Sequence, residues 1–376
     1  MCKKKVMVIL GTRPEAVKLA PVIDALKKYD DFQIVVLSTA QHRQILDQVL
    51  TIFGIVPDYD LNIMTASQTI DDVTIACLKG VGEVLEKEKP DFIVVQGDTT
   101  TVFASALAGF YNRIPVGHVE AGLRTSDLFS PYPEEANRRL ASVLADLHFA
   151  PTVRAAANLE REGVSAKKIH ITGNTVVDAL LDVAGRSFDL STNFPHVAKF
   201  LDGIDRLILV TAHRRESFGA PFHDMCGAFL DIIHAYSDVG VIYPVHPNPN
   251  VRQTVSSVLG NEPRVLLVDP LDYITFIHLM KRSFLLLTDS GGVQEEAPSL
   301  RKPVLIMRNK TERQEGIEAG VARLVGTGRH GIFVEVSELL NDSSLYKKMA
   351  SGLNPFGDGK AAARIASIIS DYFKEK

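Results

Sequence analysis

The chain has 376 residues, of which 46% are hydrophobic and 23% charged; this is the balance of an ordinary globular protein too long for one compact α/β domain. Its 41 basic residues nearly balance its 45 acidic residues, which excludes a surface built globally for nucleic acid or membrane, so any anion site must be local. Cys2, Cys77 and Cys226 are far apart and form no CxxC pair, so we expect neither a disulfide framework nor a thiolate metal site.

The amino terminus starts with basic residues, as a signal peptide does. However, its apolar stretch from Val6 to Leu10 is about half as long as a secretory core and leads directly into Arg13 and Glu15. The uncharged segment Thr99 to Asn112 is shorter than the ~20 apolar residues of a membrane span. We therefore expect a cytoplasmic protein.

Short apolar runs rich in β-branched residues alternate with segments of helical period along the chain. In the first half the runs are 5–10, 33–38, 92–96, 114–119 and 147–150, and in the second half they are 206–212, 241–246, 264–269, 284–290 and 302–307. Between the first two runs, Ala16, Leu19, Ile23 and Leu26 have the spacing of one buried helical face. Because the runs are continuously apolar, they predict parallel strands covered by helices on both faces.

Repeated strand–helix units of this kind predict two doubly wound, Rossmann-like domains. We expect the boundary in 174–196, where the periodicity is lost, so that residues 1–174 form the first domain and 175–360 the second. The helical segment 361–376 is expected to pack back on the first domain. Such domains would place the carboxyl ends of both sheets around one interdomain cleft.

Polar residues follow five of the predicted strands directly. They are Gly11-Thr12-Arg13, Gly97-Asp98-Thr99, His213-Arg214-Arg215, His246-Pro247-Asn248-Pro249 and Asp289-Ser290-Gly291-Gly292. Surface loops are commonly polar, which explains any one of these motifs. Five at the same end of the strands indicate a ligand site.

The last of these motifs has the form of an anion site. Ser290, Gly291 and Gly292 open a helix whose free N–H groups can bind a phosphate, and Glu296 follows one turn later, where its carboxylate can accept hydrogen bonds from a ribose diol. A nucleoside diphosphate requires donors and acceptors in this order. The alternative is an acidic first helical turn capped by Ser290.

Basic residues near strand ends support an anionic ligand. Arg13 and Lys18 flank a helix start, where cations oppose the helix dipole, and His213 can donate to a phosphate or protonate a departing oxygen. The alternatives are solvated cations at Arg13 and Lys18 and a structural loop histidine at His213. Arg313 lies in a run dense in both charges, where a surface ion pair is a strong alternative.

Three acids lie at strand ends or helix starts of the first domain: Asp98, Glu120 and Glu134. Carboxylates that converge on a cleft repel one another, which raises at least one pKa and suits proton transfer to or from carbon. Taken singly, each also fits a helix cap or an ion pair. The chain contains no GxGxxG after a strand, no GxxxxGK[ST] and no HExxH, so we expect no dinucleotide cofactor, Walker-type loop or zincin-type zinc site.

Nine motifs in order resemble the non-hydrolysing UDP-N-acetylglucosamine 2-epimerases over nearly the whole chain. They are GTRPEAVKLAPV, TAQHRQILDQVL, QGDTTT, HVEAGLRT, YPEEANRR, HRRESFG, HPNP, LTDSGGVQEEAPSL and KTERQEGIEAG. The resemblance implies the glycosyltransferase-B architecture, no cofactor, a homodimer and a supply of sugars for cell-surface polysaccharides. It also implies interconversion of UDP-N-acetylglucosamine and UDP-N-acetylmannosamine by elimination of UDP to a 2-acetamidoglucal, followed by re-addition.

The resemblance assigns residues position by position. UDP-binding positions match Arg13, Lys18, His213, Leu271, Phe276, Ser290, Gly291, Gly292, Glu296 and Arg313. Catalytic positions match Asp98, Glu120, Glu134 and His213, with Asp98 and Glu120 also contacting substrate. Gln41 and Gln44 match part of a second, activating substrate site found in several bacterial members, which also uses an arginine where this chain has Ser67.

Four other functions remain open at this point. They are a hydrolysing 2-epimerase that releases free N-acetylmannosamine, a 2-epimerase of a related UDP-diacetamido sugar, a retaining glycosyltransferase of the same architecture, and a nucleotide-sugar sensor without activity.

Overall fold

The computed structural model describes residues 3–40, 43–65, 67–125 and 127–375. It divides into unit 1, which comprises Met1–Ala179 and Phe356–Lys376, and unit 2, Leu180–Pro355. The first division lies within helix α7 (Thr175–Gly185), later than the expected boundary after Asn174, and the second lies after Pro355 instead of residue 360. The segment around the boundary is more regular than its sequence indicates, because α7 runs through it.

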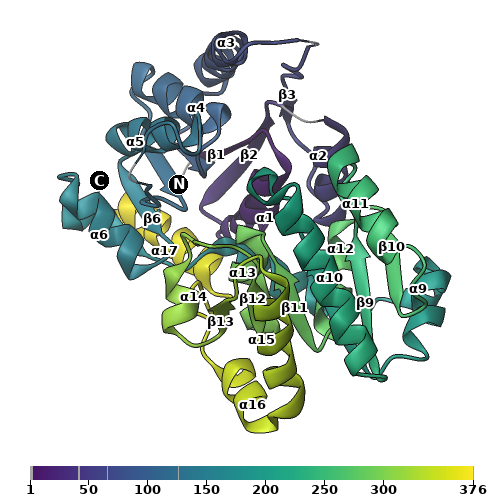
Figure 1. The fold of residues 1–376 in the computed structure, drawn as a ribbon. Helices are drawn as coiled ribbons and strands as arrows, with labels where there is room; N and C mark the ends of the chain where they lie inside the picture. The colour runs from purple at the N-terminus through teal and green to yellow at the C-terminus, as the bar shows by residue number, and fades with distance from the viewer. Residues whose placement is uncertain (1–2, 41–42, 66, 126, 376) are drawn as a thin grey trace. The chain divides into compact units, whose positions relative to one another are not determined.

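Within the described residues, unit 1 contains a seven-stranded parallel sheet with the order β3-β2-β1-β4-β5-β6-β7 (Figure 1). Its strands are β1 (Lys4–Leu10), β2 (Phe32–Ser38), β3 (Tyr59–Asp60), β4 (Phe92–Gln96), β5 (Val116–Val119), β6 (Leu147–Ala150) and β7 (Ile169–Ile171). All five residues of β4 are buried, as expected for a strand with helices on both faces.

The helices of unit 1 follow the strands in alternation. They are α1 (Arg13–Lys27), α2 (Arg43–Ile52), α3 (Ile70–Glu88), α4 (Thr100–Tyr111), α5 (Glu134–Leu144) and α6 (Val153–Arg161), with the 3-10 turn η1 (Ala166–Lys168) and the start of α7. Ala16, Leu19, Ile23 and Leu26 of α1 are fully buried, which confirms the predicted apolar face.

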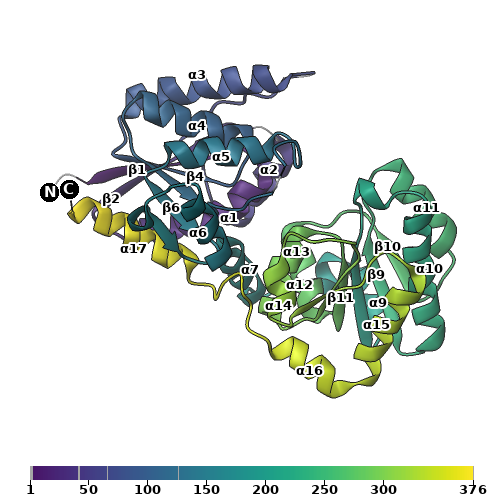
Figure 2. The same ribbon diagram turned by 60° about the vertical axis from the view of Figure 1, so that its left-hand side comes forward.

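The C-terminal helix α17 (Ala361–Lys374) packs against α1, as the sequence predicts (Figure 2). The Asp178 carboxylate caps its start by accepting the N–H groups of Ala361 and Ala362 at 3.2 and 2.9 Å. At its end, the rings of Tyr372 and Phe373 pack edge-on against Phe92 of β4.

Unit 2 contains, among the residues described, a six-stranded parallel sheet with the order β10-β9-β8-β11-β12-β13. Its strands are β8 (Arg206–Thr211), β9 (Val239–Pro244), β10 (Val265–Val268), β11 (Leu285–Thr288), β12 (Val304–Ile306) and β13 (Ala322–Leu324). Its helices are the end of α7, α8 (Leu190–Asn193), α9 (Pro195–Leu201), α10 (Ala220–Ala235), α11 (Pro249–Leu259), α12 (Tyr273–Arg282), α13 (Gly291–Glu296), α14 (Gln314–Glu318), α15 (Arg329–Asn341) and α16 (Ser343–Ser351), with 3-10 turns η2 (Arg215–Ser217) and η3 (Ala297–Leu300).

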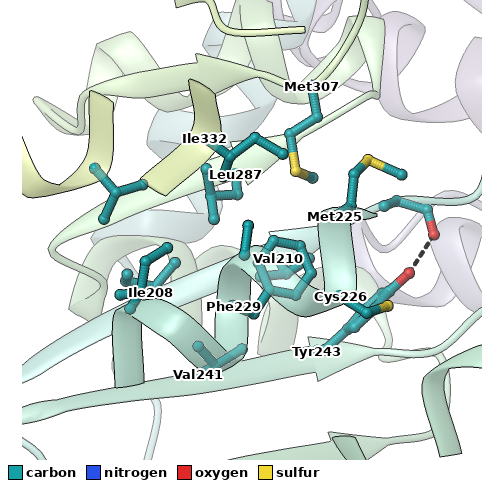
Figure 3. Packing of buried hydrophobic residues seen from close by; sticks show 14 of the residues in the cluster. Ile208, Val210, Met225, Cys226, Phe229, Val241, Tyr243, Leu287, Met307 and Ile332 are labelled. Atoms are coloured by element: carbon teal, nitrogen blue, oxygen red, sulfur yellow. Dashed lines mark hydrogen bonds between the residues drawn. The ribbon is translucent and has the colours of Figure 1, made fainter. Parts of the chain in front are cut away.

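A hydrophobic core joins the sheet of unit 2 to its helices (Figure 3). Val210 of β8, Phe229 of α10 and Tyr243 of β9 are buried side by side in it. The Tyr243 hydroxyl is satisfied because it donates to the carbonyl oxygen of Ala212 at 2.5 Å, beyond the end of β8. The core therefore holds the start of the loop that carries His213.

Both sheets are doubly wound, as predicted. The chain order runs outward in opposite directions from β1 and β4 in unit 1 and from β8 and β11 in unit 2. Ligands of open α/β sheets bind beyond the carboxyl ends of the strands at such switch points. None of the helices within the described ranges combines the length and apolarity that a bilayer span requires.

Candidate functional site

The switch point of unit 1 lies between the loops that carry Arg13 and Asp98. Arg13 follows β1 and opens α1, and Asp98 follows β4. Glu120 comes directly after β5, which pairs with β4 in the register Gln96↔Val119. The sheet therefore places three of the predicted residues on adjacent strand ends.

Glu120 is held by polar partners from three parts of unit 1. Its carboxylate oxygens lie 2.6 and 2.7 Å from the Lys18 ammonium, and Asn174 donates to it at 3.1 Å. Gln96 also donates to it from the end of β4. The backbone of Glu120 has φ +63°, a left-handed conformation that costs a non-glycine residue energy and occurs often at functional sites. This carboxylate is fixed in place and paired with a cation.

Asp98 forms an ion pair with Arg138 of α5, whose guanidinium also lies 3.2 Å from Glu135. The Asn137 amide donates to the backbone carbonyl of Asp98 at 3.1 Å. Glu134 is the first residue of α5, but its side chain makes no hydrogen bond or ion pair with any residue the structure describes. Direct contacts therefore tie Asp98 to α5, but none joins the Glu134 carboxylate to the other two acids.

Glu15 is a buried acid at the same switch point, and its sequence context did not single it out. Its carboxylate accepts the backbone N–H of Thr12 at 2.9 Å, the N–H of Gly11 and the hydroxyl of Thr99, so it joins the loop after β1 to the loop after β4. Burial raises the pKa of Glu15 to about 7, against the hydrogen bonds that lower it. The acid whose pKa is raised is thus Glu15, which is not one of the three acids predicted from the sequence; of those three, Asp98 and Glu120 have cationic partners.

Arg13 differs from the other cations near this switch point. Its side chain makes no ion pair or hydrogen bond with residues in the described ranges. An unpaired cation at a helix start opposes the helix dipole. Its placement fits an anionic ligand better than a structural role.

The switch point of unit 2 lies between the loops after β8 and β11. The ring of His213 stacks on that of His246, from the loop after β9, with centroids 5.3 Å apart and planes at 9°. Nδ1 of His213 lies 3.5 Å from Oδ1 of Asp289, which is fully buried. Three of the five polar motifs thus meet at adjacent strand ends.

The Ser290–Gly292 segment forms the start of α13. Ser290 occupies the N-cap position, but its hydroxyl makes no capping hydrogen bond, which argues against a purely structural cap. The Arg313 guanidinium lies over Gly291, where an added Cβ would come within 3.2 Å of the guanidinium carbon. Arg313 also forms ion pairs with Glu295 at 2.9 Å and Glu312 at 3.2 Å. The arginine is thereby fixed beside the proposed phosphate position.

Glu296 lies at the end of α13 and accepts a hydrogen bond from the Tyr273 hydroxyl of α12 at 3.1 Å. Phe276 is on the same helix α12, and Leu271 precedes it in the loop after β10. The predicted ribose acceptor is therefore held against the helix that carries the predicted Phe276.

A family model described as UDP-N-acetylglucosamine 2-epimerase matches residues 24–370. A UDP-N-acetylglucosamine 2-epimerase of Escherichia coli (strain K12) is 51% identical over 374 residues, which cover 98% of each chain.

The chain belongs to the UDP-N-acetylglucosamine 2-epimerase family.

A solved structure of the family agrees over the whole length. It is the UDP-GlcNAc 2-epimerase of Neisseria meningitidis bound to UDP-GlcNAc, with a TM-score of 0.86, 44% identity and coverage of 98% of this chain and 100% of that one. The glycosyltransferase of kitacinnamycin, only 12% identical, has a TM-score of 0.67 over 98% of this chain and 99% of its own, so it shares the fold. The glycosyltransferase-B-type architecture predicted for this UDP-N-acetylglucosamine 2-epimerase family member is confirmed.

The second, activating site predicted for this UDP-N-acetylglucosamine 2-epimerase family member lies partly outside the described residues. Gln41 lies outside the described residues, and the side chain of Gln44, in α2, is also outside them. Ser67 is exposed and has φ +62°. The activating site stays a prediction.

Proposed function

We propose that the protein interconverts UDP-N-acetylglucosamine and UDP-N-acetylmannosamine without a cofactor and without net hydrolysis. Family membership supports the epimerase activity and the nucleotide-sugar substrate. The observation that carries the proposal is the location of the predicted residues: Asp98 and Glu120 lie at the switch point of one sheet, and His213 and Ser290–Gly292 at that of the other.

The C2 hydrogen of the sugar is barely acidic, because C2 is not next to a carbonyl group. In the proposed reaction a carboxylate removes this proton, the C2–H electrons form the C1=C2 double bond, and the C1–O bond breaks with its electron pair on UDP. Protonation of C2 on the opposite face and return of the UDP oxygen to C1 complete the epimerisation. No oxidant is consumed.

Cationic side chains and the N–H groups at a helix start stabilise the negative charge that develops on the departing UDP. We assign this role to Arg13, Lys18, His213, Arg313 and the start of α13. We assign proton transfer at C2 to Asp98, Glu120 and Glu134. Lys18 has two roles in this proposal: it stabilises the charge on UDP, and its ion pair fixes the Glu120 carboxylate.

Turnover of UDP-N-acetylglucosamine in heavy water, without cofactor or acceptor, tests the mechanism. We expect deuterium at C2 of the product and of recovered substrate, and loss of this exchange in Asp98→Asn. Product that keeps its original C2 hydrogen would refute the elimination route. In the same NMR time course, release of free N-acetylmannosamine would identify a hydrolysing enzyme, and preference for a UDP-diacetamido sugar would change the substrate.

We further propose a cytoplasmic homodimer that supplies sugars for cell-surface polysaccharides. Exposed apolar side chains on α4 and α5 support self-association, namely Phe110, Tyr111, Leu140 and Val143, with exposures of 60%, 65%, 47% and 83%. Sedimentation analysis of the wild type and of Val143→Asp tests the dimer: we expect a dimer that the charge weakens, and a wild-type monomer would refute it.

A further inference from the structure

Asp289 is a buried carboxylate to which the proposed reaction gives no role. It follows β11 directly at the switch point of unit 2, and its side chain is fully buried. Its Oδ2 accepts the backbone N–H groups of His213 and Arg214, each at 2.7 Å. These two bonds connect the start of the phosphate-binding segment to the loop that carries His213.

The second oxygen of Asp289 faces the His213 imidazole. Oδ1 lies 3.5 Å from Nδ1 of that ring and accepts no hydrogen bond within the described part of the chain. A buried carboxylate oxygen without a donor is costly, so an N–H directed at it is strongly favoured. Nδ1 of His213 is the titratable nitrogen in position to supply one.

Contacts with neighbouring residues fix the His213 loop and ring relative to Asp289. Tyr243 holds the carbonyl of Ala212, and the hydroxyls of Thr211 and Thr288 lie 2.5 Å apart at the ends of β8 and β11. His246 stacks on the ring of His213, so it limits ring rotation. The loop therefore presents one edge of the imidazole to Asp289.

We propose that Asp289 is a positioning residue whose carboxylate accepts the Nδ1 proton of His213 and so directs Nε2 at the departing diphosphate, to which the doubly protonated ring donates. The carboxylate–histidine arrangement of hydrolases fixes a tautomer by the same physical principle. The part that concerns the diphosphate rests on the proposed function. The part that concerns the tautomer does not.

Imidazole ¹⁵N chemical shifts of histidine-labelled protein test the tautomer directly, with His213 assigned by comparison with His213→Gln. In the neutral form of the wild-type ring we expect the proton on Nδ1. Asp289→Asn retains an oxygen for the two backbone N–H groups but turns an amide N–H₂ toward Nδ1, so it should move the proton to Nε2. Asp238→Asn, which alters an ion pair with Arg206 elsewhere in unit 2, is the matched control and should leave the tautomer unchanged.

Kinetics then connect the tautomer to turnover. Asp289→Asn should lower kcat about 10²–10⁴-fold with a smaller change in KM, and adding His213→Gln should cost little more, since both act through one group. A wild-type ring protonated on Nε2, or a tautomer unchanged in Asp289→Asn, would overturn the inference, even if activity falls. A different outcome separates the two proposals. If Asp289→Asn moves the proton to Nε2 but the wild type epimerises no UDP-sugar, the Asp289–His213 relationship is supported and the proposed function is refuted.

Discussion

The ammonium of Lys18 lies 2.6 and 2.7 Å from the two carboxylate oxygens of Glu120. The side chains are only 17% and 6% exposed, so both charges are largely removed from water. The pair joins α1 to the residue after β5, and it fixes a proposed catalytic acid beside the switch point. Its charges therefore stabilise each other and shape the site.

Breaking this pair on one side should destabilise unit 1. Lys18→Met leaves Glu120 buried without its cation, at a cost of about 3–5 kcal/mol for a buried pair. The double variant Lys18→Met/Glu120→Gln should recover part of that loss, because it removes both charges. Urea unfolding followed by circular dichroism measures the coupling, and strictly additive losses would contradict it.

Arg13 should affect substrate binding without affecting stability. Because it has no partner among the described residues and opposes the α1 dipole, Arg13→Gln should keep or slightly raise the unfolding temperature. It should also lower kcat/KM about 10–100-fold through the loss of a charged hydrogen bond to phosphate. Lys27→Gln, at the other end of α1, is the control and should leave kcat/KM unchanged. A large loss of stability in Arg13→Gln would show a structural role.

Glu296 should recognise the ribose hydroxyls. Glu296→Gln should raise KM for UDP-N-acetylglucosamine about 10-fold, since a charged acceptor is lost. With a 2′,3′-dideoxyribose analogue the wild type and the variant should have similar KM values. Tyr273→Phe, which removes only the 3.1 Å hydrogen bond to Glu296, should have a smaller effect on KM. An equal penalty for both substrates would rule out diol recognition.

The buried Glu15 should give unit 1 a distinct pH dependence. Burial raises its pKa from 4.5 to about 7, so between these pH values the folded protein holds a proton that the unfolded chain has lost. This contribution to the free energy of unfolding is present below pH 4.5 and is lost as the pH rises to 7. A glutamine at this position cannot ionise. Between pH 5 and pH 8 the free energy of unfolding of Glu15→Gln should therefore rise by up to about 3 kcal/mol relative to that of the wild type.

The difference between variant and wild type is the informative quantity in that experiment. Burial lowers the pKa of His118 from 6.5 to about 4, so its neutral form favours folding above pH 6.5 and this contribution is lost as the pH falls to 4. The two effects oppose each other in the wild type. A stability difference between Glu15→Gln and wild type that does not change with pH would contradict the raised pKa of Glu15.

Ser67 should weaken activation by substrate. It stands where the resemblance implies an arginine of the second substrate site, and a serine cannot replace a guanidinium that binds phosphate. We expect a hyperbolic substrate curve for the wild type. A strongly sigmoidal curve that disappears in Gln44→Ala would contradict this.

The sequence predicted the central strands and one edge strand, β10, but missed the other three edge strands of the two sheets. The continuous apolar runs correspond to β1, β2, β4, β5 and β6 in unit 1 and to β8–β12 in unit 2. The three strands it missed, β3, β7 and β13, have two or three residues each and lie at sheet edges. An edge strand is covered less and needs fewer apolar residues, so its pattern is weak.

Site residues could be predicted where a polar motif directly follows a strand. They were harder to predict where their bonding partner is distant in the sequence. Asp98, His213 and Ser290 could be placed at strand ends from local sequence alone. Glu15 resembled an ordinary acid in a first helical turn, because its bond to Thr99 depends on β1 and β4 being neighbours. Asp289 was predicted only as part of a polar motif, because its bonds to the amides of His213 and Arg214 depend on β8 and β11 being neighbours.

The return of α17 to unit 1 affects the order in which a nascent chain can complete its two units. Residues 356–376 belong to unit 1 but follow all of unit 2 in the chain. While the ribosome makes residues 180–355, the face of α1 and the side of the Phe92 ring that α17 contacts are not yet covered by that helix. Domains usually finish folding in the order of synthesis. Here all of unit 2 is synthesised before unit 1 is complete, because α17, the last helix of unit 1, is made at the end of the chain.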